Sequence, residues 1–176
     1  MAQAFVAIGS NIEPAKNIRQ ALRLLAKSVR LTAISTFYRD PAIRHPDQPL
    51  FYNGVVSIET ELPPAELKWG VLRPIEAALG RRRTQDKYAA RTIDLDLILY
   101  DQRVLATAEL TLPDPNILKR SFVAIPLAEL APDLVLPGSG VPIRQAAGQL
   151  ASDRLELLDE LTRQLRAERL SHAGDF

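Results

Sequence analysis

Short apolar runs and apolar residues at helical spacing alternate along the first hundred residues. Residues 4–10 form an apolar run that stops at Gly9, which predicts a buried strand. Pro14 then opens a segment with an apolar face, made of Ile18, Ala21, Leu22 and Leu25. This spacing, behind a proline suited to a first helical turn, predicts an amphipathic helix.

Two more strands follow, separated by a loop. Residues 29–39 are rich in β-branched and aromatic side chains, which predicts one long strand. Residues 40–50 contain three prolines and are expected to form a loop. Residues 51–62 combine apolar and β-branched side chains again, so the chain is predicted to return as a strand.

A second helix is predicted over residues 63–80, where Gly80 is the stop signal. Its expected buried stripe consists of Leu67, Val71, Ile75 and Leu79. Pro74 lies inside this segment and is expected to kink the helix, because an interior proline removes a hydrogen bond. Residues 81–90 are polar and predict a loop, and residues 91–100 predict the last strand of the series.

This order of elements predicts the fold class. Strand, helix, strand, strand, helix, strand is the ferredoxin-like βαββαβ order, an α+β fold whose antiparallel sheet carries its helices on one face. A proline-rich loop at residues 112–115, an apolar helix near residues 122–130 and shorter elements are expected to decorate that core.

The end of the chain predicts one more amphipathic helix, over residues 151–170. Its apolar positions are Leu155, Leu158, Leu161 and Leu165. We favour packing of this helix on its own domain, with pairing to a second subunit as the main alternative, so both monomer and homodimer stay open. We therefore assign residues 1–150 to one domain and residues 151–176 to its C-terminal helical extension.

Composition and charge narrow the class of protein. A chain of 176 residues is long enough for one domain with a substantial core. It has no cysteine, which excludes disulfides and thiolate chemistry and favours a cytoplasmic setting. With 22 basic and 21 acidic residues the net charge is +1, so no polyanionic partner is demanded. Neither a signal peptide nor an apolar run of about 20 residues is found.

Two aspartates interrupt the apolar run of residues 91–100. Asp94 and Asp96 are two positions apart, so both carboxylates project from one face of a strand. The opposite face carries Ile93, Leu95 and Leu97. Neighbouring carboxylates repel one another and are costly to bury without a partner. A salt bridge to Arg91 or to a neighbouring lysine would satisfy them, and so would a bound metal ion.

Basic residues gather just before this strand and again in a later loop. They are Arg81, Arg82, Arg83, Lys87, Arg91, Lys119 and Arg120. Arginine suits phosphate oxygens, while carboxylates hold Mg²⁺, which is commonly shared with substrate phosphates. Both together are typical of phosphoryl transfer and predict a nucleotide with Mg²⁺. The usual phosphate-binding motifs, GxxxxGK[ST] and GxGxxG, do not occur.

Six segments in order resemble the 6-hydroxymethyl-7,8-dihydropterin pyrophosphokinases of folate biosynthesis. They are AIGSN, FYR, DQPLFYN, IEAALGR, RTIDLDLILY and RSFVAIPLAELAPDLVLP. The resemblance covers about residues 4–150, and RTIDLDLI is its most specific part. It implies a reaction in which the pterin hydroxymethyl oxygen attacks the β-phosphorus of ATP, giving the pterin diphosphate and AMP.

The resemblance also implies roles for individual residues. Asp94 and Asp96 would hold two Mg²⁺ ions, with Arg81 and Arg91 as further catalytic residues. The implied ATP contacts are Glu76, Arg83, Tyr88 and Arg120. The implied pterin contacts are Asp40, Ile43, Phe51, Asn53 and Phe122. From residue type alone, the two phenylalanines would be core aromatics and the asparagine a turn or strand-end residue.

The sequence departs from the family pattern on the nucleotide side. Ala89 and Ala90 stand where a Gly/Pro-type pair is usual, Asp114 replaces a histidine, and Glu109 replaces an arginine of some members. Added acids near a triphosphate repel it. A pterin-binding or regulatory paralogue without the activity is therefore the first alternative. A small RNA-binding domain is the second, although the chain lacks the aromatic-rich motif of such domains.

Overall fold

The computed structural model describes residues 1–172, with a six-stranded antiparallel sheet at the centre. The strands of this sheet are β1 (Ala2–Ser10), β2 (Arg30–Ile34), β3 (Tyr38–Asp40), β4 (Phe51–Thr60), β5 (Asp94–Tyr100) and β8 (Glu156–Leu157). A separate two-stranded sheet consists of β6 (Leu105–Ala106) and β7 (Thr111–Leu112). The helical elements are α1 (Pro14–Leu25), α2 (Pro64–Glu66), the π-helical turn η1 (Leu67–Leu72), α3 (Arg73–Ala78), the 3-10 helix η2 (Pro115–Leu118), α4 (Ser121–Leu130), α5 (Ile143–Gln149) and α6 (Asp159–His172).

The strand order confirms the predicted core. β1 lies between β5 and β4, and β4 pairs with both β2 and β3. All these pairings are antiparallel, and β1 runs against β4 in continuous register from Ala2 opposite Thr60 to Ser10 opposite Tyr52. This order is consistent with a ferredoxin-like sheet, with β5 at one edge.

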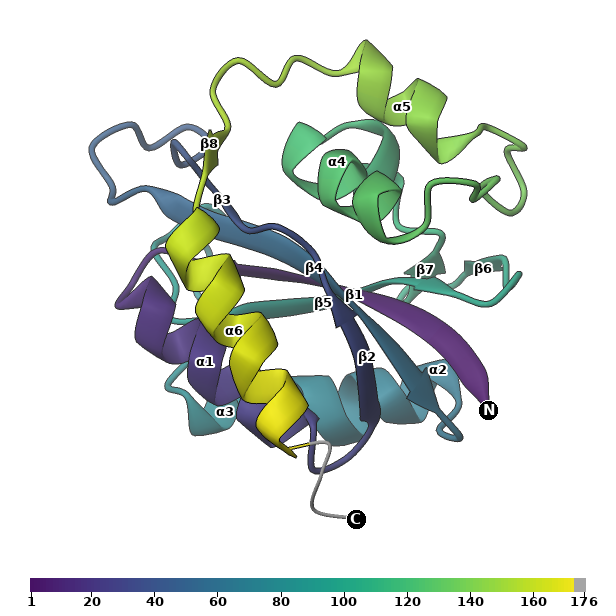
Figure 1. Ribbon diagram of the computed structural model, residues 1–176, viewed down its shortest axis with the longest axis horizontal. Coiled ribbons are helices and arrows are strands. Elements are labelled where there is room, and N and C mark those ends of the chain that lie inside the picture. Colours follow the sequence, from purple (N-terminus) through teal and green to yellow (C-terminus); the bar gives the residue numbers. More distant parts are fainter. Residues whose placement is uncertain (173–176) are drawn as a thin grey trace.

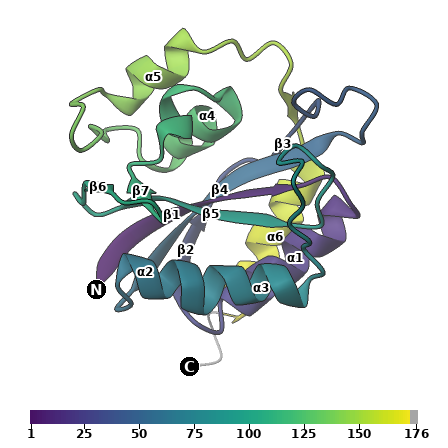
Figure 2. The same cartoon turned by 180° about the vertical axis from the view of Figure 1, so that it is seen from behind.

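Helices cover both faces of the sheet, which corrects the prediction of a single covered face. Figures 1 and 2 show α1, α3 and α6 on one side of the sheet and α4 and α5 on the other. The first core, beneath the sheet, includes Ile18, Leu25, Phe37, Leu67, Leu95 and Leu165. The second core, under α4 and α5, includes Phe5, Val55, Ile98, Val123 and Ile143. The sheet is therefore the middle of three layers.

The predicted strand over residues 29–39 is wrong as a single element, because it splits into β2 and β3. At the break, three polar groups of the chain bind partners outside a regular ladder. The Ser35 hydroxyl accepts from Val55 N–H (2.9 Å), Thr36 N–H donates to Glu129 (2.9 Å) and Phe37 N–H donates to Thr162 Oγ1 (2.9 Å). The interruption buries the Phe37 ring between the sheet and α6.

The helix predicted over residues 63–80 exists, but it contains a wide π-helical turn where Pro74 was expected to produce a kink. The N–H of Arg73 donates to the carbonyl of Lys68, five residues earlier. Pro74 offers no N–H of its own, so the wider turn sits where the regular α-helical ladder would be broken. Gly80 ends the segment with a φ of 80°, as predicted.

The last predicted helix begins later than expected. Residues 151–155 contain no strand or helix, β8 pairs with β3, and α6 starts at Asp159, so Leu155 and Leu158 precede the helix. Leu161 and Leu165 are buried in the first core. Arg166 Nη2 also reaches Glu129 on α4 (2.9 Å). These contacts are the intramolecular packing expected for this part of the chain.

Two other boundaries differ from prediction. The strand expected over residues 91–100 begins at Asp94, because Arg91 and Asn11 hold the preceding segment in a loop. The proline-rich loop at residues 112–115 instead joins β7 directly to η2. Among residues 1–172, no helix has the length and apolar character that a membrane crossing requires.

Candidate active site

The two aspartates lie on the face of β5 that looks toward α4. Asp94, Asp96 and Ile98 share this face and line a cavity of about 330 Å³. Leu95 and Leu97 point into the first core, as the alternation predicted. The side chains of Asp94 and Asp96 are 19% and 44% exposed, so both carboxylates are accessible from the cavity.

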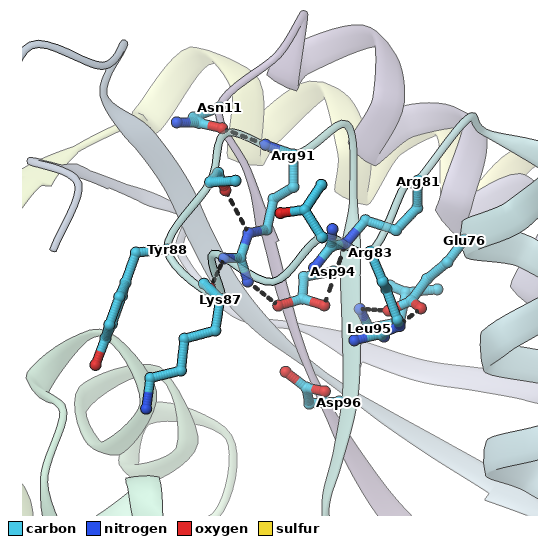
Figure 3. Close-up of polar contacts among 12 residues, drawn as sticks. Asn11, Glu76, Arg81, Arg83, Lys87, Tyr88, Arg91, Asp94, Leu95 and Asp96 are labelled. Carbon is cyan, nitrogen blue, oxygen red and sulfur yellow. Dashed lines mark hydrogen bonds and ion pairs between the residues drawn. The ribbon is translucent and has the colours of Figure 1, made fainter. Parts of the chain in front are cut away.

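Asp94 is already paired with arginine. Arg91 Nη1 lies 2.8 Å from its Oδ2 and Arg81 Nε lies 3.9 Å from its Oδ1, and Figure 3 shows both side chains approaching it. The salt bridge from Arg91, which the sequence predicted as an alternative to a bound metal ion, is thus present at Asp94. Arg81 is only 8% exposed, and its Nε has no hydrogen-bond partner. Burial lowers the pKa of Arg81, against the opposing effect of Asp94.

Asp96 is less well compensated. Its one described ion pair joins Oδ1 to Arg73 Nη2 at 3.7 Å. Protein atoms around the cavity displace bulk water, and this desolvation, together with repulsion from Asp94, raises the pKa of Asp96 to about 7. Arg73 opposes the shift without cancelling it. The acidic pair therefore lacks positive charge at its Asp96 end.

Glu76 of α3 binds the backbone of β5 at the edge of the sheet. The carboxylate accepts from Leu95 N–H (2.8 Å) and pairs with Arg73 (2.7 Å) and Arg83 (2.9 Å), while its side chain is only 2% exposed. Arg73 also donates to the carbonyl of Leu95. An edge strand offers unpaired backbone groups, and these two side chains satisfy them in place of a further strand. Glu76 thereby fixes the strand that carries the aspartates.

Arg91 is held in place by the loop that precedes β5. Its N–H donates to Asn11 Oδ1 (2.8 Å), and its guanidinium donates to the carbonyls of Lys87 and Ala89. Asn11 also donates to Gln48, whose own amide reaches the carbonyl of Tyr88 (3.2 Å). The loops at residues 41–50 and 81–93 are thus joined through Asn11 and Gln48.

A second contact joins the same two loops at the rim of the cavity. His45 Nε2 lies 3.0 Å from Asp86 Oδ2, and the Arg44 guanidinium lies 4.9 Å from the centre of the Tyr88 ring. Tyr88 and Lys87 both line the cavity. The basic loop therefore forms one wall of the site.

Part of the cavity wall suits a flat aromatic ligand, next to Arg91, whose guanidinium lies 5.7 Å from the centre of the Phe51 ring. Phe51 from the start of β4 and Phe122 from α4 line it together with Asn53, Asp40 and Ile43. Gly9 leaves room for the Asn53 amide, because a Cβ at this position would lie 2.8 Å from Asn53 Oδ1. An amide beside two phenylalanine rings can hydrogen-bond the polar edge of a ring that lies between them.

A smaller cavity of about 150 Å³ opens on the other side of Asp96. Asp96 and Asp114 line both cavities, so the two meet at the acidic pair. The smaller one is also lined by Lys68, Arg73, Leu97 and Leu110. Burial raises the pKa of Asp114, while its hydrogen bond from Asn116 N–H opposes the shift.

Most of the predicted site residues meet in the larger cavity. These are Asp40, Ile43, Phe51, Asn53, Tyr88, Arg91, Asp94, Asp96, Arg120 and Phe122. Arg81 lies behind Asp94, whereas Glu76 and Arg83 form an ion pair below the strand and line neither cavity. Glu109 lines the smaller cavity, and Ala89 and Ala90 lie in the basic loop.

Sequence reasoning missed Arg73, Lys68 and Asn11. The spacing of Arg73 and Glu76, three residues apart on a predicted helix, was a usable signal for an ion pair. Lys68 gave no such signal, because its direction depends on the π-helical turn. Asn11 was noticed only within the AIGSN segment, and its link between two loops is a tertiary feature.

The acidic pair fits Mg²⁺. Two carboxylate oxygens on one strand face open into a cavity with room for water and phosphate, the ligand set that Mg²⁺ normally combines. A cation bound here would also offset the desolvation and the Asp94 repulsion that raise the pKa of Asp96. Residues 1–172 hold no group of three or more His, Cys, Asp or Glu side chains suited to a metal ion. An ion held by the two carboxylates would complete its coordination with water or substrate oxygens.

Comparisons with known proteins identify the family of this chain. A family model described as 7,8-dihydro-6-hydroxymethylpterin-pyrophosphokinase (HPPK) matches residues 5–132. A 2-amino-4-hydroxy-6-hydroxymethyldihydropteridine pyrophosphokinase from Haemophilus influenzae is 36% identical over 158 residues, which cover 88% of this chain and 97% of the relative. A relative of the same name from a Synechocystis species is 42% identical over 150 residues, covering 84% and 75% of the two chains.

Solved structures give the same fold. A crystal structure of wild-type Plasmodium falciparum HPPK-DHPS with pterin and p-hydroxybenzoate matches with a TM-score of 0.69 at 13% identity, over 90% of this chain. The match covers 48% of that protein, so the chain spans about half its length. At this identity the structural match supports the fold, whereas the sequence relatives decide the family. The chain belongs to the 7,8-dihydro-6-hydroxymethylpterin-pyrophosphokinase family.

Proposed function

We propose that this chain transfers pyrophosphate from ATP to the hydroxymethyl group of 6-hydroxymethyl-7,8-dihydropterin, in folate biosynthesis, at the paired cavities beside β5. The observation that carries the proposal is the position of Asp94 and Asp96 between an aromatic cavity and a basic wall. The named relatives support the reaction and ATP as co-substrate. In it, the hydroxymethyl oxygen bonds to the β-phosphorus, the bond from that phosphorus to the α,β-bridging oxygen breaks, and AMP leaves.

The pterin is placed in the larger cavity. Its ring would lie between Phe51 and Phe122, with Asn53 reading its polar edge and the 40–43 segment adding contacts from one side. The lack of a side chain at Gly9 supports this arrangement, since it leaves room for the Asn53 amide at the cavity wall. The hydroxymethyl group would then point toward the acidic pair.

The triphosphate is placed over the acidic pair, with the rest of the nucleotide toward the smaller cavity. Asp94 and Asp96 would hold Mg²⁺, for which we propose two ions. When bound, Mg²⁺ neutralises phosphate charge and orients the phosphoryl group. Arg91 and Arg81, which now pair with Asp94, would bind phosphate oxygens instead. Arg120 and Tyr88 line the same cavity. The buried Nε of Arg81, which lies 3.9 Å from Asp94 but makes no hydrogen bond, supports this exchange, because a phosphate oxygen could accept from it.

The catalytic contribution of the protein is positioning and charge. No side chain is required as a general base, since the hydroxyl proton can pass to solvent once oxygen bonds to phosphorus. Arginine donors held in place by the loop stabilise the charge that develops on the transferred group. Glu76 and Arg83 line neither cavity and are proposed to act by fixing β5, with direct ATP contact of either residue left as a prediction.

The alternatives are weaker. A paralogue without activity would have lost part of the acidic pair or its arginines, yet Asp94, Asp96, Arg81 and Arg91 are all in place. An RNA-recognition module stacks bases on an open sheet face, and here helices cover both faces. Cytoplasmic location and the choice between monomer and homodimer stay predictions.

The test is direct product detection. The purified chain, incubated with Mg²⁺, ATP and 6-hydroxymethyl-7,8-dihydropterin, should form AMP and pterin diphosphate in equal amounts. Omitting the pterin should abolish AMP formation. Failure to form pterin diphosphate under these conditions would overturn the proposal, and pterin binding without product would favour the inactive paralogue.

A further inference from the structure

The smaller cavity contains two cations in different circumstances. Arg73 is held by Glu76 at 2.7 Å and lies 3.7 Å from Asp96. Lys68 is half-buried and donates only to a backbone carbonyl, that of Glu109, among its described hydrogen bonds. Ion pairs with carboxylates are stronger than a contact with a neutral carbonyl. Lys68 is therefore the cation that can be recruited at low cost.

The π-helical turn is what brings Lys68 to this cavity. In a regular α-helix, residues five apart point in directions about 140° apart. Here Arg73 N–H bonds to the Lys68 carbonyl in a wider turn, and both side chains line the same cavity. Such turns occur frequently at functional sites.

An anionic ligand in this cavity would need a nearby cation. Lys68 could serve as that cation only if its ammonium leaves the Glu109 carbonyl. Asp96, Asp114 and Glu109 contribute negative charge to its wall. Burial lowers the pKa of Lys68, with Arg73 acting in the same direction and Asp96 against it. The flexible four-carbon stem allows the ammonium to move from the carbonyl to a phosphate oxygen.

We propose that Lys68, presented by the π-helical turn, is a nucleotide-binding residue that leaves the Glu109 carbonyl to contact the phosphates of ATP. This inference rests on the proposed function, because it takes the smaller cavity as the nucleotide side. It also accounts for the acids Asp114 and Glu109 on that side: the ammonium of Lys68 offsets part of their repulsion. Arg73 acts as a positioning residue, held by Glu76 and facing Asp96.

The chain contains a single tryptophan that can report this movement. Trp69 is 48% exposed, and the Lys68 ammonium lies 4.8 Å from the centre of its ring. A cation this close interacts with the ring face. Departure of Lys68 toward a phosphate should therefore change the emission of Trp69.

The experiment compares Lys68→Met with Lys27→Met, which removes the same charge from the exposed turn after α1. The probe is the Mg²⁺ complex of an ATP analogue with a methylene group in place of the α,β-bridging oxygen, which cannot transfer pyrophosphate. We expect its Kd to rise about tenfold in Lys68→Met, with adenosine and dihydropterin binding within twofold of the unmodified chain. Lys27→Met should bind all three normally, and Lys68→Arg should recover part of the loss.

Two readouts separate the outcomes. Binding of the analogue should change Trp69 emission in the unmodified chain, and binding of adenosine should not. An unchanged analogue Kd in Lys68→Met, or an equal loss of adenosine binding, would overturn the role of Lys68 while leaving the activity intact. If the unmodified chain neither binds the analogue nor forms AMP, the proposed function itself fails.

Discussion

Asp96 is the residue whose ionisation is most sensitive to its surroundings. In the folded chain its pKa is raised to about 7, against an ordinary value of 3.8. Between these two values the folded state keeps a proton that the unfolded chain has released. The stability linked to this group is therefore present below about pH 4 and is lost as pH rises toward 7. A cation at the acidic pair would reverse this penalty.

This linkage makes a pH prediction. A metal ion must displace the proton from Asp96, so its apparent affinity should weaken about tenfold per pH unit below the raised pKa. We expect Mg²⁺ to raise the melting temperature more at pH 8 than at pH 6. Thermal melts with and without Mg²⁺ at both values provide the measurement. The same increase at both pH values would contradict the coupling, and Asp96→Asn should remove the dependence.

Glu76 of α3 holds the edge strand β5 in place, and we expect this role to be structural and not catalytic. Glu76 is buried against Arg73, Arg83 and the backbone of Leu95. Removing one member of a buried ion pair leaves its partner without compensation. The strand that carries Asp94 and Asp96 should thus lose its anchor when this carboxylate is neutralised.

Glu76→Gln should lower the free energy of unfolding by about 3 kcal/mol. Glu66→Gln, at an exposed position in the same helical segment, should change it by less than about 0.5 kcal/mol. Urea titration measures both. In assays on the folded fraction, the KM for ATP of Glu76→Gln should stay within a few-fold of normal. A large rise in this KM at unchanged stability would instead make Glu76 a direct ATP ligand.

The elements that were predictable are those whose pattern is local. The period-2 arrangement around Asp94 and the helical spacing in α1 were both confirmed. The split between β2 and β3 was not predictable, because it depends on Glu129 and Thr162 from distant segments. The π-helical turn was also hidden, since Pro74 signals a disturbed helix without stating its form.

In the candidate site, too, local features were predictable and tertiary contacts were not. The acidic pair and the arginine cluster could be read from neighbouring residues, and the resemblance added the pterin contacts. The partners of Asp96 and Arg91 could not, because Arg73 and Asn11 reach them only through the tertiary fold. Local sequence thus indicated the chemistry, and the sheet edge determined which side chains support it.

The three-layer arrangement explains why the site lies where it does. β5 is an edge strand between the two helical layers, and the cavity at its aspartates is also lined by residues of two loops. α6 takes part in this arrangement from the far end of the chain, because Leu165 fills the first core and Thr162 binds the break before β3. The end of the described chain is therefore a structural component of the sheet on which the site is built.

Leu165→Ala should accordingly destabilise the whole molecule. The side chain is 2% exposed, and its truncation should cost about 3 kcal/mol of unfolding free energy. Leu157→Ala, at a leucine that is 60% exposed, is the matched control and should have little effect. Denaturant unfolding followed by circular dichroism measures both. Equal stability of the two variants would show that α6 does not contribute to the common core.

We propose that Asp94 and Asp96 support pyrophosphoryl transfer without forming the pterin site. The most direct measurement compares pterin diphosphate formation and dihydropterin affinity in Asp94→Ala, Asp96→Ala and the control Asp133→Ala, which alters an exposed aspartate far along the chain. We predict that either site variant loses turnover by about a thousandfold or more while dihydropterin binds within a few-fold of normal. Turnover near the normal rate in either site variant would show that the transfer does not depend on the acidic pair.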